Sequence, residues 1–224
     1  MKRIVVDIET VGQDFDLLDE TSQEYFLKFA DSEEKIEEAK NSLSFYPLTA
    51  QVVTIGMLEV ESEEGAVYFQ TDAEAATKFK EGAVHYIICQ DEKEILNHFW
   101  TQMNRYDQLI SFNGRLFDCP FLMIRSAIQQ IRTTKNLMPN RYNSGFHVDL
   151  ADQLTFYDAM RRKFSLHMWC KAFGIKSSKE DGVTGLQVKD LYKEKKFNEI
   201  ARYCLRDVQA TKELFQYWEK YLKF

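Results

Sequence analysis

Short apolar runs alternate with stretches of helical spacing along the 224 residues, and this order restricts the possible folds. Residues 3–7 are rich in β-branched side chains and predict a buried strand. Residues 51–60 and 66–70 flank a short turn and predict a hairpin. Residues 91–106 then carry apolar side chains at the spacing of an amphipathic helix. Strand and helix signals alternate from there onward.

The second half of the chain completes this pattern. Residues 108–112 and 146–150 predict short strands, and residues 85–89 predict a further one. Residues 197–221 predict a long helix, whose apolar face carries Ile200, Tyr203, Cys204, Val208, Thr211 and Phe215. The order indicates an α/β protein with a mixed central sheet of about five or six strands flanked by helices. The chain contains no linker that would divide it, so we expect residues 1–224 to form a single domain.

Residues 12–48 interrupt the alternation between the first two strands. They are rich in Asp and Glu up to residue 41, and their spacing is compatible with helices, one of them capped by Asp31. We therefore expect a helical insert at residues 12–48. Its acidic face is most simply a solvated surface, with a partner-binding role as the alternative.

Composition narrows the class of protein. The net charge of −6 and the pI of about 5.4 argue against a protein that coats duplex DNA through a broad basic face, but a site built from carboxylates is compatible with them. The four cysteines have no zinc-finger spacing and predict reduced, buried thiols. Neither a signal peptide nor a run of about 18–20 apolar residues is evident, so we expect a cytoplasmic protein with no membrane association.

Carboxylates follow the apolar runs at two places. Asp7 and Glu9 end the first strand, and side chains two residues apart on a strand face the same side. Such a pair repels unless it is compensated, and a hard divalent cation is one remedy, with an edge salt bridge as the alternative. Asp118 falls in the first turn of a helix predicted at residues 116–127, at the carboxyl end of the sheet, where α/β sites usually lie. An ordinary carboxylate at a helix N-terminus would have the same sequence pattern.

A third carboxylate lies on the long helix. Tyr203 and Asp207 are four residues apart and therefore point the same way, on the face that carries the apolar residues. A carboxylate directed toward the core needs a cation or an ion-pair partner, and Arg202 and Arg206 are candidates for the second role.

Taken together, these segments resemble the three motifs of the DEDD superfamily of 3′-5′ exonucleases. The matching segments are Asp7-Ile8-Glu9, Asn113-Gly114 through Phe117-Asp118, and Tyr203 through Asp207. Tyrosine in the last motif resembles the DEDDy subgroup. The chain also resembles the predicted exonucleases related to the proofreading domain of family B DNA polymerases. This resemblance extends over most of residues 1–215, is weakest over residues 12–41, and implies an RNase H-like fold.

The resemblance also implies an activity. It predicts a stand-alone, metal-dependent 3′-5′ exonuclease that acts on the 3′ end of a nucleic acid, with single-stranded DNA as the expected substrate and DNA processing or repair as the expected role. The implied cofactors are two divalent cations, Mg²⁺ or Mn²⁺, held by Asp7, Glu9, Asp118 and Asp207. Tyr203 would orient the attacking water, because a phenol with a pKa near 10 is a poor general base at neutral pH.

Further residues have expected roles in binding or support. The implied substrate-binding residues are Ile8 and Thr10, through their backbone, together with Asn113 and Phe117. Aromatic side chains stack on unpaired bases, although Phe117 is equally suited to core packing. Positively charged candidates for phosphate contacts are Lys171, Lys176 and Lys179, which surface exposure alone would also explain. His147 and Asp149 match a family motif and are expected to buttress the site.

Two alternatives stay open at this stage. The same fold could act on RNA, as RNase D-like relatives do, since a single contact to a 2′-hydroxyl can decide the sugar. The chain could also be a non-catalytic domain that binds nucleic acid or a protein, although none of the five motif residues is substituted. No particular protein partner is predicted.

Overall fold

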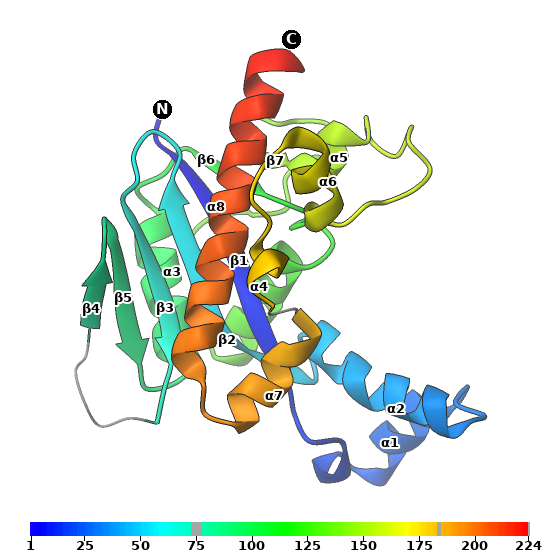
Figure 1. The fold of residues 1–224 in the computed structure, drawn as a ribbon. Helices are drawn as coiled ribbons and strands as arrows, with labels where there is room; N and C mark the ends of the chain where they lie inside the picture. Colours follow the sequence, from blue (N-terminus) through cyan, green and yellow to red (C-terminus); the bar gives the residue numbers. More distant parts are fainter. Residues whose placement is uncertain (73–77, 183–184, 224) are drawn as a thin grey trace.

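The computed structural model describes residues 1–72, 78–182 and 185–223, and one mixed sheet runs through the middle of them (Figure 1). Its strands are β1 (Arg3–Gly12), β2 (Ala50–Glu59), β3 (Gly65–Gln70), β4 (Lys78–Glu81), β5 (Val84–Cys89), β6 (Gln108–Ser111) and β7 (His147–Asp149). Hydrogen bonds place them in the order β4-β5-β3-β2-β1-β6-β7. The first three strands are antiparallel neighbours, as expected, whereas β6 and β7 continue the sheet parallel to β1.

The sheet has seven strands in the described part of the chain, rather than the expected five or six. The unexpected strand is β4, which lies at the edge and pairs only with β5. Three of its four residues are exposed, and Phe79 alone is half-buried. A short edge strand of this kind lacks the buried alternation by which strands are recognised in a sequence.

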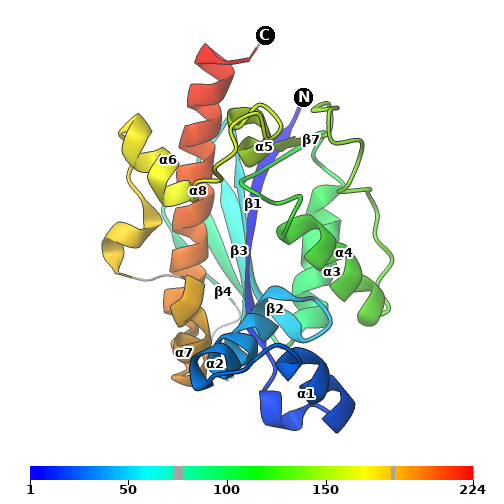
Figure 2. The same ribbon diagram turned by 90° about the vertical axis from the view of Figure 1, so that its right-hand side faces the viewer.

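Helices cover both faces of the sheet (Figure 2). They are α1 (Glu20–Leu27), α2 (Glu33–Ser42), α3 (Glu92–Met103), α4 (Asp118–Ile128), α5 (Leu150–Leu154), α6 (Leu166–Phe173), α7 (Val188–Lys193) and α8 (Phe197–Tyr221). α3 and α4 lie on one face, and α8 with α6 lies on the other. The bounds of α8 agree with the prediction, whereas the six-residue α7 was not anticipated. Within the described residues, no helix combines the length and the apolar character that crossing a bilayer requires.

β1 separates two cores because its side chains alternate. Ile4, Val6 and Ile8 pack among side chains of α3 and α4. Val5 packs instead into the core beneath α8, and Val11 packs against the first turns of that helix. Residues 7 and 9 share the odd-numbered face. The carboxylates of β1 are therefore directed toward α8.

A glycine on the sheet makes room for side chains of α8. Gly56 on β2 pairs with Asp7, and a Cβ placed there would lie 2.8 Å from Val208 Cγ2 and 3.0 Å from Cys204 Sγ. Only glycine leaves room for this approach. The predicted apolar face of α8 is buried throughout, from Ile200 to Phe215.

The insert at residues 12–48 is helical, as predicted, and projects beyond the end of β1 (Figures 1 and 2). Neither α1 nor α2 buries a residue, in agreement with a solvated acidic surface. The predicted helix cap is wrong by one residue. Ser32 caps α2 by accepting a hydrogen bond from the Lys35 backbone, and Asp31 instead pairs with the Lys35 side chain at 2.7 Å.

Candidate active site

Three elements bring the four predicted carboxylates to one place. β1 carries Asp7 and Glu9, α4 begins at Asp118, and α8 carries Asp207 (Figure 1). The backbone N–H of Ile8 donates a hydrogen bond of 3.1 Å to Asp118 Oδ1, which fixes the start of α4 against β1. α8 adds Asp207 to the same place, so that Asp7 and Asp207, which are distant in the sequence, influence each other electrostatically.

The pKa values of these carboxylates show that they lie close to one another. Burial raises the pKa of Asp7 well above its usual value, and Asp118, Asp207 and Glu9 raise it further. The pKa of Glu9 is raised in the same way, by burial first and then by Asp207 and Asp118. Burial, assisted by Asp149 and Asp207, raises the pKa of Asp118 to about 7. Four such groups cannot all be ionised at neutral pH without a positive charge among them.

A comparison within the same molecule shows how unusual this arrangement is. Glu92 is also buried, but Arg125 pairs with it at 2.6 Å and the Val52 backbone N–H donates to it at 2.8 Å. Among the described residues, no lysine or arginine forms an ion pair of 4 Å or less with any carboxylate of the cluster, which consists of Asp7, Glu9, Asp118 and Asp207. The ion pairs with arginine that would explain these carboxylates as structural are therefore absent from the described part of the chain.

A strained loop positions Asp118. Asn113 adopts a positive φ of 62°, and a Cβ on Gly114 would collide with the side chain of Ser111. The carboxylate of Asp149 holds this loop by accepting hydrogen bonds of 2.8 Å from the backbone N–H groups of Asn113 and Arg115. Asp149 therefore supports the loop through backbone contacts, as the buttressing role predicts.

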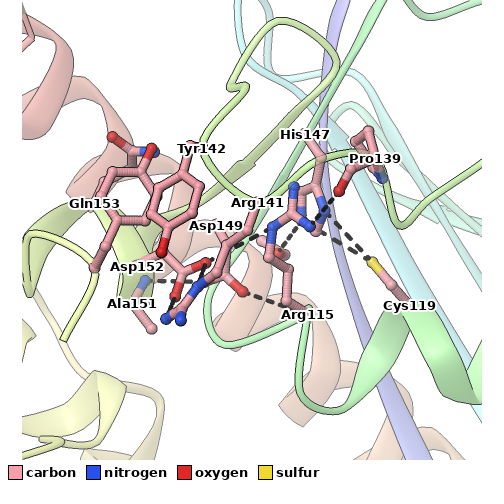
Figure 3. A network of polar contacts seen from close by, with 12 residues as sticks. Arg115, Cys119, Pro139, Arg141, Tyr142, His147, Asp149, Ala151, Asp152 and Gln153 are labelled. Atoms are coloured by element: carbon pink, nitrogen blue, oxygen red, sulfur yellow. Dashed lines mark hydrogen bonds and ion pairs between the residues drawn. The ribbon is translucent and has the colours of Figure 1, made fainter.

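Arg115 and Arg141 connect the loop before α4 to neighbouring segments (Figure 3). The buried guanidinium of Arg115 donates a hydrogen bond of 2.9 Å to Pro139 O and lies 3.7 Å from Asp152. Arg141 approaches Asp152 at 2.5 Å and Asp158 at 2.7 Å. These contacts tie the loop before α4 to the loop around Pro139 and to α5.

His147 belongs to this supporting network and not to the carboxylate cluster. Its Nδ1 lies 3.0 Å from Leu137 O and its Nε2 lies 2.8 Å from Ser111 Oγ. The ring therefore donates to Leu137 through Nδ1 and accepts the Ser111 hydroxyl proton through Nε2. Burial and the nearby Arg115 lower the pKa of His147 to about 4, so the ring is neutral at physiological pH.

Tyr203 and Asp207 lie one turn apart on α8 and point toward the cluster. Burial raises the pKa of Tyr203 well above its usual range, and Asp207 and Glu9 raise it further, so its hydroxyl keeps its proton. Asp207 accepts a hydrogen bond of 2.5 Å from Ser178 Oγ. Burial raises the pKa of Asp207, and the contacts with Ser178 and Tyr203 partly offset that effect.

The predicted substrate-binding residues surround the cluster in different ways. The Ile8 side chain is buried in the core, and the Thr10 hydroxyl donates to Ser44 O at 2.7 Å. Asn113 lines a cavity of about 500 Å³ that Asp149 also lines, whereas the four cluster carboxylates do not line it. Phe117 is half-buried, and its ring centroid lies 5.3 Å from that of Phe121, so part of its surface is used in packing.

The three predicted lysines differ in their surroundings. Lys171 is exposed and pairs with Glu180 at 3.2 Å. Lys176 lines a second cavity together with Ser178. Lys179 is close enough to Asp207 to lower the pKa of that carboxyl. Of the three, Lys179 has the clearest electrostatic connection to the carboxylate cluster.

Sequence reasoning missed several residues that shape the site. Ser178 was not among the predicted site residues, and it lies in a 3-10 turn that brings its hydroxyl to Asp207. Cys204 Sγ lies 3.7 Å from Asp7 Oδ2, and the ligand atoms of Asp7, Glu9 and Cys204 all lie within 4.8 Å of one another. The position of Cys204 beside Tyr203 in the third motif was the only signal for it.

Comparison with known proteins identifies the family. Residues 45–222 match the model of a family described as a predicted 3′-5′ exonuclease related to the exonuclease domain of PolB. The chain belongs to this family. The match to this PolB-related exonuclease family includes Asp118, Tyr203 and Asp207 but begins after Asp7 and Glu9. Asp7 and Glu9 are therefore assigned to the cluster because the fold places them there, and not because of the family match.

A solved structure has a similar fold. The chain is similar to the family B DNA polymerase of the hyperthermophilic archaeon Pyrobaculum calidifontis, with a TM-score of 0.63 and 16% sequence identity. The similarity covers 98% of this chain and 24% of the polymerase, so the chain spans about a quarter of that protein's length. It shows the RNase H-like fold that the sequence predicts for this member of the PolB-related family. No curated protein matches the chain.

Proposed function

We propose that this chain is a 3′-5′ exonuclease that uses two divalent cations, Mg²⁺ or Mn²⁺, to hydrolyse single-stranded DNA from its 3′ end. The observation that carries the proposal is the carboxylate cluster. Asp7, Glu9, Asp118 and Asp207 come together from three separate elements, without an ion-pair partner among the described residues. Membership of a predicted exonuclease family supports the same activity.

The residues fit divalent cations in chemical terms. Carboxylate oxygens are the ligands that Mg²⁺ and Mn²⁺ prefer. Burial, and then the neighbouring carboxylates, raise the pKa values of Asp7 and Glu9, and a bound cation would stabilise their charged forms. In the proposal, Asp7, Glu9, Asp118 and Asp207 would together hold the two ions. Bound there, two cations would supply an activated water and stabilise the charge that develops on the phosphate.

Tyr203 has a different role in the proposal. Because its hydroxyl keeps its proton, it cannot remove a proton from water. It can donate one hydrogen bond and accept others, and it lies beside Asp207, one of the proposed ligands. Tyr203 therefore orients the attacking water without acting as the general base.

Substrate contacts follow from the surroundings of the cluster. Since the Ile8 side chain is buried and its N–H is bonded to Asp118, the nucleotide would meet the remaining backbone of residues 8–10. Asn113 and the exposed part of Phe117 would contact the terminal sugar or base. Lys179, near Asp207, would contribute positive charge for the phosphate.

A polarity assay tests the proposal. The purified chain is incubated with a 5′-labelled single strand in Mg²⁺ or Mn²⁺. We expect a ladder of products shortened one nucleotide at a time from the 3′ end, no products in EDTA, and no cleavage of a circular single strand. A linear strand that stays intact in both metals would contradict the proposal, and binding without hydrolysis would favour a non-catalytic domain. A parallel digestion of RNA of the same sequence decides between the two sugars.

A further inference from the structure

A second group of metal-ligating side chains lies on the opposite face of the sheet from the carboxylate cluster. Cys89 ends β5, and Glu94 and His98 lie one turn apart on α3, which follows directly (Figure 1). Their ligand atoms all lie within 4.8 Å of one another. The sequence gives no zinc-like spacing here, because the ligands meet only through the tight connection between strand and helix.

Hydrogen bonds fix Glu94 before any ion binds. Its backbone N–H donates to Asp91 Oδ1 at 2.8 Å, and its own Oε2 accepts from the Gln90 backbone N–H at 2.7 Å. This arrangement resembles a capping box, except that Glu94 accepts from the residue before the N-cap Asp91. It leaves the other oxygen, Oε1, directed toward His98 Nε2 at 3.7 Å. In the described ranges, no lysine or arginine pairs with Glu94.

The other two ligands are also held in place. The His98 ring stacks on the buried ring of Tyr68, with centroids 5.0 Å apart and planes 11° apart. The Cys89 side chain is buried in the core beneath α3. Little conformational entropy would therefore be lost on binding an ion.

We propose that Cys89, Glu94 and His98 form a zinc site that clamps the end of β5 to α3. Sulfur, imidazole nitrogen and carboxylate oxygen together suit Zn²⁺ rather than Mg²⁺. Oxygen and nitrogen ligands at about 2.0–2.2 Å from a tetrahedral ion lie about 3.3–3.6 Å from one another. The 3.7 Å separation of Glu94 and His98 is slightly longer, so the two side chains would have to close only a small gap around an ion. The side chains of both are about 40% exposed, which leaves an open side where water completes the coordination.

The chemistry of binding involves one proton. The thiolate, not the thiol, is the form of cysteine that binds a metal ion. The sulfur–metal bond forms as that proton passes to the solvent. The bound site then holds a thiolate, a carboxylate and a neutral imidazole around the divalent ion.

Cobalt substitution in the full-length, reduced, metal-free chain tests this site. Thiolate coordination of Co²⁺ produces a sulfur-to-metal absorption band, which the carboxylates of the catalytic cluster cannot produce. We expect this band at one equivalent of Co²⁺, with stoichiometric displacement by Zn²⁺. The band should be lost in Cys89→Ser and His98→Gln but kept in Cys204→Ser, which removes the thiol beside Asp7.

The affinity for Zn²⁺ gives the quantitative result. We expect His98→Gln to weaken binding by at least about 100-fold, since loss of an outer partner alone costs about 10–100-fold. His98 is partly exposed, so this variant decides the question even where Cys89→Ser fails to fold by circular dichroism. The proposal is overturned by absence of the thiolate band, by its persistence in His98→Gln, or by its loss in Cys204→Ser alone.

Discussion

At the scale of single residues, the buried carboxylates of this protein differ in whether a positive charge lies next to them. Glu92 has a guanidinium and a backbone N–H as partners, whereas Asp7 has neighbouring carboxylates that raise its pKa. Compensated charges stabilise a fold or leave it unaffected, and uncompensated ones destabilise it. The carboxylate cluster therefore lowers the free energy of unfolding, as expected of groups selected for function.

This difference predicts opposite results for two similar substitutions. In EDTA, Asp7→Asn should raise the free energy of unfolding by about 1–2 kcal/mol, because folding otherwise has to protonate Asp7 or bury its charge among other carboxylates. Glu92→Gln should lower it by about 3 kcal/mol, because Arg125 loses its partner in the core. Urea denaturation measures both. A loss of stability in Asp7→Asn would show that the carboxylate is structural.

Tyr203 permits a second prediction. Because its hydroxyl positions water rather than transferring a proton, Tyr203→Phe should lower kcat by about 10–100-fold and leave KM for a short DNA strand nearly unchanged. Tyr217→Phe, on the same helix but partly exposed, is the matched control and should retain activity. A kcat for Tyr203→Phe equal to that of the wild type would exclude the positioning role.

The raised pKa of Asp118, about 7, gives a pH dependence. Since the folded state holds this proton more tightly than the unfolded state, the stability of the metal-free protein should fall as pH rises from about 4 to about 7. His147 has the opposite effect: its lowered pKa costs stability as pH falls below about 6.5. The test is therefore the difference in melting temperature between wild type and Asp118→Asn, in EDTA. We expect the variant to gain more at about pH 8 than at about pH 5, and an equal gain at both would contradict the assigned shift.

At the scale of elements, the site depends on how closely α8 approaches the sheet. Asp207 can join Asp7 only because Gly56 leaves space for Cys204 and Val208. The contact is between backbone and side chains in a packed core, which does not adjust freely to an added methyl group.

Gly56→Ala should therefore displace α8. We expect a loss of about 1–3 kcal/mol in stability and a fall in exonuclease activity larger than the loss of folded protein explains. Gly185→Ala, where no atom lies within 4 Å of the added Cβ, is the control. Thermal unfolding and initial rates measure the two effects. Full activity in Gly56→Ala would show that the spacing of α8 is not needed for the site.

The success of sequence reasoning also differs from element to element. α8 was predicted to the residue because its apolar stripe, from Ile200 to Phe215, extends over about four turns. β4 and α7 were missed because each is short and buries few side chains. The turn that places Ser178 beside Asp207 was missed because only its tertiary contact distinguishes it from a loop.

At the scale of the whole molecule, the carboxylate cluster could be predicted from the sequence because each carboxylate follows a recognisable local signal. Asp7 and Asp118 end apolar strands or open helices, and Asp207 lies on an amphipathic face. The Cys89–His98 group could not, since its ligands meet through a strand-to-helix connection that has no sequence signature. The net charge of −6 fits an enzyme whose attraction for a phosphate depends on bound cations rather than on a basic surface.

The central claim is that the four gathered carboxylates hold divalent cations. The most direct test is anomalous diffraction from crystals of the protein soaked with Mn²⁺ and a deoxynucleoside monophosphate, the expected product. The account predicts anomalous peaks coordinated by Asp7, Glu9, Asp118 and Asp207, and their loss in Asp7→Asn. Manganese found only elsewhere, with these four side chains free of metal beside a bound nucleotide, would contradict it.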